Sequence, residues 1–325
     1  MRHRFVLPVL AALLHLHATL LEDPRGARGH DGEEGASVPQ APAYRTETDL
    51  VYLIVAITDR RGRPITGLEA SAIRVYEDGV EQKIEHFTTS QRPLTVGLVL
   101  DRSSSMSGMM GEVYGAALHV LDTLGEHDQA FALTFNSDVT LVQPLTSDLE
   151  SVRRSLLGLS ATGTTALYDA AFEGLEYLAH AGHGTGDRKV LCVVSDGEDN
   201  ASLTSYPALL EKAKESDAVI YSVAMTETPA WSVLGWLLGR DIRRLRELAE
   251  MTGGTAHRPR SLEECESAMK RIAEELRTQY GLGYYSNNRQ RDGRWRRVSV
   301  TLADKYRDYR IRTRRGYYAP LAGTP

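Results

Sequence analysis

Four stretches of the sequence, at residues 96–100, 130–135, 190–194 and 218–223, consist almost entirely of apolar residues. Strands that are buried on both faces have this composition, whereas strands with one exposed face alternate apolar and polar residues. Segments whose apolar residues recur at three and four positions, as in an amphipathic helix, lie between these stretches. The alternation predicts an α/β domain over residues 93–279, in which helices cover both faces of a doubly wound parallel sheet. In such a sheet, ligands bind beyond the carboxyl ends of the strands.

The segments on either side of this domain, residues 44–92 and 280–320, have a different character, because their apolar and polar residues alternate. They predict three strands each, at residues 48–57, 73–76, 82–87, 280–285, 295–302 and 309–318. Asp78-Gly79 predicts a hairpin turn between the second strand and the third. Since three strands alone form a sheet of marginal stability, we expect both segments to pack together as one small β-sandwich, with the α/β domain inserted between them.

Residues 1–21 have the order of a secretory signal peptide. Arg2 and Arg4 precede an apolar run at residues 5–14, which is shorter than the roughly 20 residues of a membrane-spanning helix. Residues 22–43 contain glycine, proline and mixed charges with almost no large apolar side chain, which predicts a flexible stem. We therefore expect an exported protein that is periplasmic, at the cell surface or secreted. A buried core helix or an uncleaved anchor at residues 1–21 is the alternative interpretation.

Charge and cysteine content exclude several classes of partner and site. The chain has 38 Lys and Arg against 43 Asp and Glu, a balance that does not indicate a nucleic-acid partner. Residues 289–315 are locally basic, with eleven Lys or Arg against three Asp. We interpret this segment as a solvated strand face that complements an acidic domain. A binding site for polyanions is the alternative. Cys192 and Cys265 are the only cysteines, so a disulfide framework and paired-cysteine zinc sites are excluded. Both lie in apolar patterns and are expected in the core.

Three polar clusters fall where the predicted sheet places a site. They are Asp101-Arg-Ser103-Ser-Ser105-Met-Ser-Gly108 after the first buried strand, Thr162-Gly-Thr-Thr165-Ala-Leu-Tyr-Asp169 at a helix start, and Ser195-Asp196-Gly-Glu-Asp-Asn200 after a later strand. Each cluster alone is typical of a helix cap or a turn. Together they provide carboxylate and hydroxyl oxygens, which are the ligands that Mg²⁺ prefers, with water or a ligand in the remaining positions. Mn²⁺ and Ca²⁺ are alternative ions.

The three clusters, in this order, resemble the metal-ion-dependent adhesion site of the von Willebrand factor A domain, a Rossmann-like fold. That site consists of DxSxS, a threonine in a Gly-Thr-rich loop, and the aspartate of a [ST]DG turn. The resemblance implies metal ligation by Asp101, Ser103, Ser105, Thr165 and Asp196. Thr164 is the alternative to Thr165, because the loop reads Thr-Gly-Thr-Thr. Further pieces, among them Tyr76-Glu-Asp-Gly79, 248–254 and 314–318, are similar to an exported bacterial family related to this domain.

The resemblance implies a protein that uses its metal ion to capture an exposed Asp or Glu of a protein partner, in adhesion or another protein–protein interaction, and not an enzyme. We expect no cofactor other than the metal, no catalytic residue and no nucleic-acid partner. Peripheral association with the cell envelope and any oligomeric state are compatible with the resemblance. One alternative is a metal-dependent hydrolase, for which Glu198 and Asp199 are the nearby candidate bases. The other alternative is a structural envelope protein with a vestigial metal site.

Overall fold

The computed structural model describes residues 50–89, 92–181, 188–225, 233–259 and 261–322. The chain divides into two compact units, Met1–Thr46 and Glu47–Pro325, and everything described below belongs to the second. The predicted signal peptide and stem lie outside the described residues. Among the helices that are described, none combines the length and the apolar character needed to cross a membrane.

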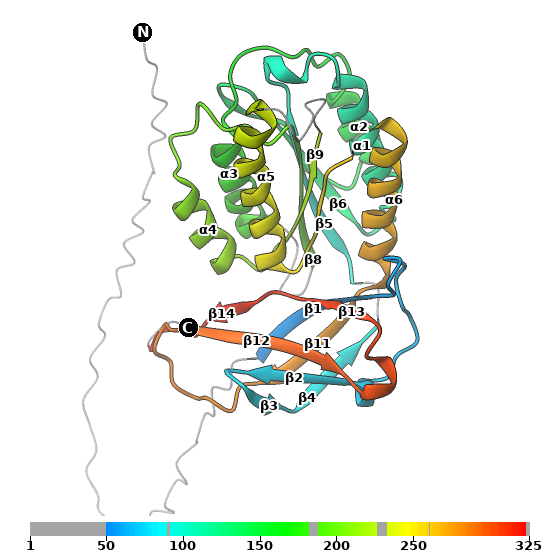
Figure 1. Cartoon of the computed structure of the whole chain (residues 1–325), viewed down its shortest axis with the longest axis vertical. Helices are drawn as coiled ribbons and strands as arrows, with labels where there is room; N and C mark the ends of the chain where they lie inside the picture. Colours follow the sequence, from blue (N-terminus) through cyan, green and yellow to red (C-terminus); the bar gives the residue numbers. More distant parts are fainter. Residues whose placement is uncertain (1–49, 90–91, 182–187, 226–232, 260, 323–325) are drawn as a thin grey trace, which may run out of the picture. The chain divides into compact units, whose positions relative to one another are not determined.

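A sheet of six strands forms the centre of the α/β domain (Figure 1), in the order β10-β9-β8-β5-β6-β7. The strands are β5 (Leu94–Asp101), β6 (Gln129–Phe135), β7 (Val139–Thr146), β8 (Arg188–Ser195), β9 (Val219–Ala224) and β10 (Ala256–His257). The four apolar stretches are β5, β6, β8 and β9, and these strands run parallel to one another, which confirms the predicted fold class. One correction concerns β7, which was not predicted and pairs antiparallel with β6 at the edge of the sheet.

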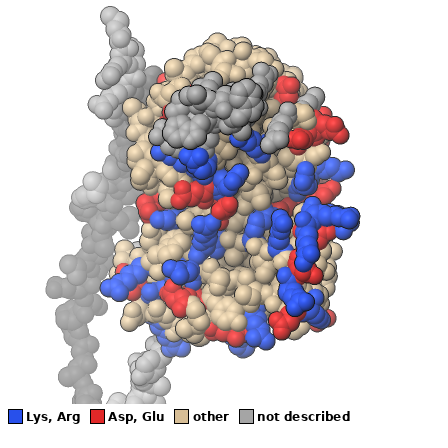
Figure 2. All heavy atoms as spheres, in the orientation of Figure 1, with Lys and Arg blue, Asp and Glu red and all other residues tan. Residues whose placement is uncertain are grey.

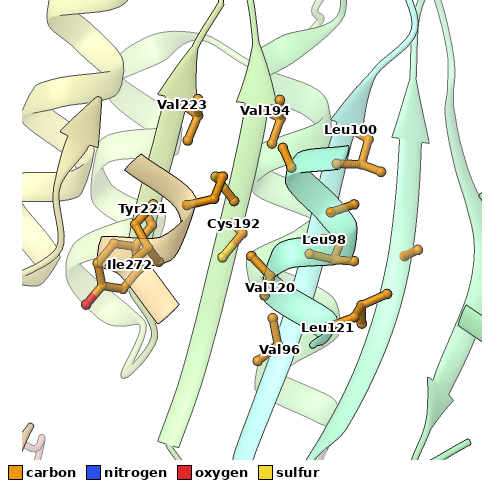
Figure 3. Packing of buried hydrophobic residues seen from close by; sticks show 14 of the residues in the cluster. Val96, Leu98, Leu100, Val120, Leu121, Cys192, Val194, Tyr221, Val223 and Ile272 are labelled. Carbon is orange, nitrogen blue, oxygen red and sulfur yellow. The ribbon is translucent and has the colours of Figure 1, made fainter. Parts of the chain in front are cut away.

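Helices cover both faces of this sheet (Figure 1). One layer contains α1 (Met110–Leu121), α2 (Leu149–Ser155) and α6 (Leu262–Thr278), and the other contains α3 (Leu167–His180), α4 (Tyr206–Glu215) and α5 (Val233–Thr252). Because successive side chains of a strand point to opposite faces, Leu98 packs in the first layer and Val99 in the second. Cys192 lies in the first core beside Leu98 (Figure 3), and Cys265 of α6 belongs to the same core, so the predicted core role of both cysteines is confirmed.

The flanking segments form two antiparallel sheets, ordered β13-β1-β11-β4 and β14-β12-β2-β3. Their strands are β1 (Leu50–Thr58), β2 (Ile73–Glu77), β3 (Val80–Gln82), β4 (Ile84–Thr88), β11 (Tyr280–Tyr285), β12 (Trp295–Leu302), β13 (Arg310–Arg312) and β14 (Gly316–Tyr318). Each sheet combines strands from before and after the α/β domain. Buried residues of both sheets, such as Leu53, Val75 and Val298, share one core. The predicted sandwich is therefore confirmed.

Two strand predictions in the sandwich were wrong in detail. The stretch predicted as one strand at 82–87 is divided at Lys83, so that β3 pairs with β2 in one sheet while β4 pairs with β11 in the other. The stretch predicted at 309–318 is likewise divided into β13 and β14, which belong to different sheets. In both places the chain passes from one sheet to the other, and periodicity alone does not reveal such a crossing.

The basic C-terminal segment contacts the helices of the α/β domain. Arg312 pairs with Glu275 of α6, and the Arg315 guanidinium lies 2.6 Å from a carboxylate oxygen of Glu250 on α5. Tyr318 donates its hydroxyl proton to Glu211 of α4 at 2.6 Å. These contacts agree with the interpretation of a basic segment that complements an acidic domain. Figure 2 shows basic and acidic side chains interspersed over one face of the molecule.

Candidate functional site

The site is positioned by the point at which the order of the sheet reverses. From β5 the chain proceeds outward to β6 and β7, and it then returns to β8 on the other side of β5. The loops after β5 and β8 therefore diverge, and open α/β sheets bind ligands at such a switch point. β5 ends at Asp101 and β8 ends at Ser195, so two of the three polar clusters begin there.

Asp101 is the buried centre of the site, with 0% of its surface exposed. One carboxylate oxygen accepts the backbone N–H of Ser103 at 2.8 Å, and the other accepts the hydroxyl proton of Ser195 at 2.6 Å. Burial raises the pKa of Asp101 to about 6, and the nearby negative charge of Asp196 adds to this rise. A carboxylate in such surroundings is stabilised by a cation placed beside it.

Shortly after Asp101 comes a short 3₁₀ turn, Ser104–Met106, of which Ser103 is the N-cap and Ser105 the middle residue. The side chain of Met106 is fully buried in the first core and anchors this turn. The two serine Oγ atoms are 3.0 Å apart, which is close enough for both to contact a single ion. Two serines that are two residues apart in the sequence thus place their hydroxyl oxygens close together in the structure.

The loop that carries Thr165 is fastened to the first loop by its backbone. Thr162 donates its N–H to the carbonyl of Arg102 at 2.8 Å, and Ser104 donates its N–H to the carbonyl of Gly163 at 3.0 Å. Thr165 is only 2% exposed.

The neighbouring threonine has a different environment. Thr164 is exposed, and its hydroxyl donates to the hydroxyl of Ser137 at 2.9 Å, on the side of the β6–β7 loop. This difference favours Thr165 over Thr164 as a ligand, and the choice stays a prediction.

The third loop turns sharply at Gly197, whose φ of +86° suits glycine and strains other residues. Asp196 just before it is 6% exposed, and its carboxylate accepts the N–H of Glu198 at 3.0 Å. Asn200 connects this loop to the second one, because its side-chain oxygen accepts the N–H of Thr165 at 2.9 Å and its own N–H donates to the Thr165 carbonyl at 3.0 Å. The three clusters are thus joined by direct hydrogen bonds.

Sequence reasoning did not assign the positioning roles of three residues, Ser195, Asn200 and Ser137. Ser195 donates to Asp101 and accepts the N–H of Gly197 at 3.0 Å, so it links the first loop to the third. Ser195 and Asn200 stand within the third cluster, but only their hydrogen bonds in three dimensions identify these roles. Ser137 follows β6 in a segment for which the sequence predicted no function.

The donor set fits a hard divalent cation. The predicted ligands Asp101 and Asp196 would supply carboxylate oxygens, and Ser103, Ser105 and Thr165 would supply neutral hydroxyls, so that every donor is an oxygen atom. Within the described residues, no three His, Cys, Asp or Glu side chains gather as they do around zinc or at carboxylate-rich metal sites. The chemistry of the donors therefore favours Mg²⁺, Mn²⁺ or Ca²⁺ over a metal that prefers nitrogen or sulfur.

Asp199, one of the candidate bases for hydrolysis, takes part in the local structure. Its carboxylate accepts the backbone N–H of Tyr168 at 3.2 Å and the hydroxyl proton of Ser202. Tyr168 is in the first turn of α3, so Asp199 helps to satisfy the N–H groups that a helix start leaves without partners. These bonds explain the carboxylate at this position without a role in proton transfer.

Comparison with known proteins agrees with this geometry. The family model of the von Willebrand factor type A domain matches residues 96–274. The chain belongs to this family. Domains of this family are commonly involved in protein–protein interaction and adhesion. The match covers the six-stranded sheet from β5 onward and most of α6, and it leaves the sandwich outside.

Relatives of known sequence or structure are distant. Bovine (Bos taurus) inter-alpha-trypsin inhibitor heavy chain H4 is 25% identical over 211 residues, which cover 60% of this chain and 22% of the bovine protein, so the chain spans about a fifth of that relative's length. A solved von Willebrand factor type A protein from Catenulispora acidiphila has a TM-score of 0.49 at 12% identity and covers 85% of this chain and 74% of its own. BatB from Bacteroides thetaiotaomicron, described as a conserved hypothetical protein, has a TM-score of 0.45 at 18% identity, covering 56% of this chain and 98% of its own.

Proposed function

We propose that this chain is an exported binding module that holds Mg²⁺ at the carboxyl ends of β5 and β8 and uses it to capture an acidic side chain of a protein partner. Asp101, Ser103, Ser105, Thr165 and Asp196 would hold the ion, with Mn²⁺ or Ca²⁺ as substitutes. The observation that carries the proposal is the convergence of the Ser103 and Ser105 hydroxyl oxygens, 3.0 Å apart, next to the buried carboxylate of Asp101.

The proportion of neutral ligands explains why such a site would bind an acidic group. Three of the five side chains are hydroxyls, which do not offset the charge of a divalent cation as carboxylates do. When bound, Mg²⁺ supplies a concentrated positive charge with an open position for an external oxygen ligand. The chain's own residues act by orienting these oxygens, since Ser195 and Asn200 fix the loops on either side.

A nearby apolar residue provides a second point of contact for a protein partner. Leu203 is 97% exposed, three residues after Asn200, and its backbone N–H donates to the carboxylate of Asp169 at 2.9 Å. Thr204 donates to the same carboxylate at 2.7 Å, so the segment that carries Leu203 is held in place. A leucine side chain that is exposed to solvent on this segment suits a partner that has an apolar pocket next to its acidic residue.

Export rests on the sequence of residues 1–21, and the absence of a catalytic role rests on the chemistry of the site. Asp199 is engaged at the start of α3, and the three loops contain no histidine. A screen of phosphoesters tests the enzymatic alternative. Metal-dependent turnover that is present in the wild type and lost in Asp101→Ala would establish a hydrolase and overturn the proposal.

Calorimetric titration with Mg²⁺ tests the proposal, with the two adjacent threonines as a matched pair. Thr165→Ala and Thr164→Ala remove the same hydroxyl from neighbouring positions, of which only the first belongs to the proposed ligand set. We expect saturable binding of one ion by the wild type and by Thr164→Ala, weaker binding by Thr165→Ala, and none by Asp101→Ala. Circular dichroism of each variant controls for folding. Absence of binding by the wild type would leave only the structural interpretation.

A partner-binding assay then tests the capture of an acidic group. Envelope extract is passed over the immobilised wild type in Mg²⁺ and in EDTA, and over both threonine variants in Mg²⁺. A specific partner is expected on the wild type and on Thr164→Ala in Mg²⁺ and is expected to be lost in EDTA. A partner that the wild type retains equally in Mg²⁺ and in EDTA would contradict a metal-mediated contact.

A further inference from the structure

A cavity of about 500 Å³ lies at the end of the central sheet opposite the candidate metal site. Arg188, which begins β8, lines this cavity, whereas Ser195, which ends β8, belongs to the metal site. The other side of the cavity is formed by Leu50, Tyr52 and Ile54 of β1, alternate residues that share one face of the sandwich. The cavity therefore lies between the α/β domain and the sandwich, and its volume is in the range of small-molecule sites.

Of the residues that the structure describes, four cationic side chains and one carboxylate line this cavity. They are Arg92, Arg188, Lys189 and Arg314, and the carboxylate is that of Asp217. Lys189 pairs with Asp217 at 3.2 Å. A cavity with this excess of cations attracts an anion, because low-dielectric walls focus the field of the charges that line it.

Arg188 is only 5% exposed, and no carboxylate of the described residues forms an ion pair with it. Two of its guanidinium nitrogens make long hydrogen bonds to neutral oxygens, at 3.3 Å to the side chain of Gln279 and at 3.4 Å to the carbonyl of Arg92. Its Nε atom is buried and, among the described residues, has no hydrogen-bond partner. The nearby carboxylate of Asp128 is bonded to Arg277 at 2.7 Å. A buried charge with these partners is costly unless a further acceptor binds it.

Arg314 extends the same arrangement from the link between β13 and β14. Its Nε donates to the carbonyl of Gly316 at 2.6 Å, and a terminal nitrogen donates to the carbonyl of Lys214 at 2.9 Å. These bonds hold the guanidinium at the cavity without neutralising it. The guanidinium carbon of Arg92 lies over the ring of Tyr52, 4.5 Å from its centroid, so this cation contacts an aromatic wall of the cavity.

Much of the remaining wall is apolar. Leu50 and Ile54 of β1 line the cavity together with Val219 of β9 and Met251 of α5. Leu50 is 46% exposed, so this wall is not covered by the packing of the sandwich against the α/β domain. A purely inorganic anion would satisfy the cations and leave this apolar surface in contact with water.

We propose that this cavity binds an organic anion with an apolar chain, in which a carboxylate or a phosphate monoester contacts the arginines and the chain lies against β1. Binding requires no covalent step and is independent of the metal site at the opposite end of β8. It gives the Nε atom of Arg188 an acceptor that the described residues do not provide, and it covers the apolar wall.

Calorimetric titration of the full chain tests this proposal, with laurate and dodecyl phosphate below their micellar concentrations as probes. Inorganic phosphate and dodecyltrimethylammonium are the controls for head group alone and for chain alone. We expect one molecule of laurate or dodecyl phosphate to bind, and the tighter of the two identifies the head group. Lys189→Gln and Arg314→Gln are each expected to weaken binding about tenfold or more, because each removes a charge-assisted contact.

Two further variants make the result specific. Arg74→Gln removes an exposed cation from β2, outside the cavity, and is expected to bind like the wild type. Leu50→Trp adds volume to the apolar wall without changing charge and is expected to reduce binding of both probes. The proposal is overturned if neither probe binds saturably, if inorganic phosphate or the cationic detergent binds as tightly, or if Arg74→Gln weakens binding as much as the cavity variants.

Discussion

Replacement of Gly253 by alanine tests whether the sandwich packs against the α/β domain as described. Gly253 follows α5 with a φ of +90°, and a Cβ atom there would lie 2.6 Å from the carbonyl carbon of Thr313 and 2.8 Å from the backbone nitrogen of Arg314. The left-handed backbone costs about 1 kcal/mol for a residue with a Cβ. The overlap with backbone atoms adds about 1–3 kcal/mol, because backbone cannot rotate away as a side chain can. We therefore expect Gly253→Ala to lower the free energy of unfolding by about 2–4 kcal/mol.

Gly158 provides the matched control for this prediction. Its φ is +73°, but a Cβ atom there would meet no atom within 4 Å. Gly158→Ala therefore carries the backbone cost without the overlap, and the two variants share the loss of glycine's freedom in the unfolded chain. Urea unfolding followed by circular dichroism measures both. The packing is contradicted if Gly253→Ala is no more destabilised than Gly158→Ala.

Two further predictions concern buried titratable groups. Burial raises the pKa of Cys192 to about 12 and that of Cys265 to about 11. We therefore expect both thiols to react with a disulfide reagent only when the protein unfolds. Reaction of either thiol in the native protein at neutral pH would contradict their core positions. Burial lowers the pKa of His257 to about 4, and the positive charges of Arg271 and Arg312 add to this effect. In the unfolded chain this histidine is protonated below about pH 6.5, whereas in the folded chain it is protonated only near pH 4. Stability is thus lost as pH falls, and urea unfolding at pH 7 and pH 5 should show a loss about 2 kcal/mol larger in the wild type than in His257→Gln. Equal losses would contradict a partly buried, neutral histidine.

The sequence determined the central sheet because its strands are buried on both faces and so carry an unbroken apolar signal. β7 escaped prediction for the opposite reason, since it is a half-exposed edge strand that contains Pro144. Proline is tolerated at an edge and argues against a strand elsewhere, so the local pattern was ambiguous. The strand divisions at Lys83 and between β13 and β14 depend on which sheet each half joins, and that is a matter of tertiary packing.

For the candidate site, the sequence indicated which residues end the strands, and the sheet order explains why they meet. Asp101 ends β5 and Asp196 follows β8, and these strands are neighbours, so the proximity of the two aspartates follows from topology. The distinction between Thr164 and Thr165 needed the structure, because it depends on Ser137, which follows a different strand. The positioning role of Asn200 likewise depends on a loop distant in sequence.

Anomalous diffraction from crystals soaked in Mn²⁺ tests the central claim most directly, because it locates the ion without reference to any partner. We predict one strong anomalous peak in contact with the hydroxyl oxygens of Ser103 and Ser105, close to Asp101 and Asp196, and its loss in crystals of Asp101→Ala. The absence of a peak at these residues in the wild type, or an unchanged peak in Asp101→Ala, would contradict the proposed metal site.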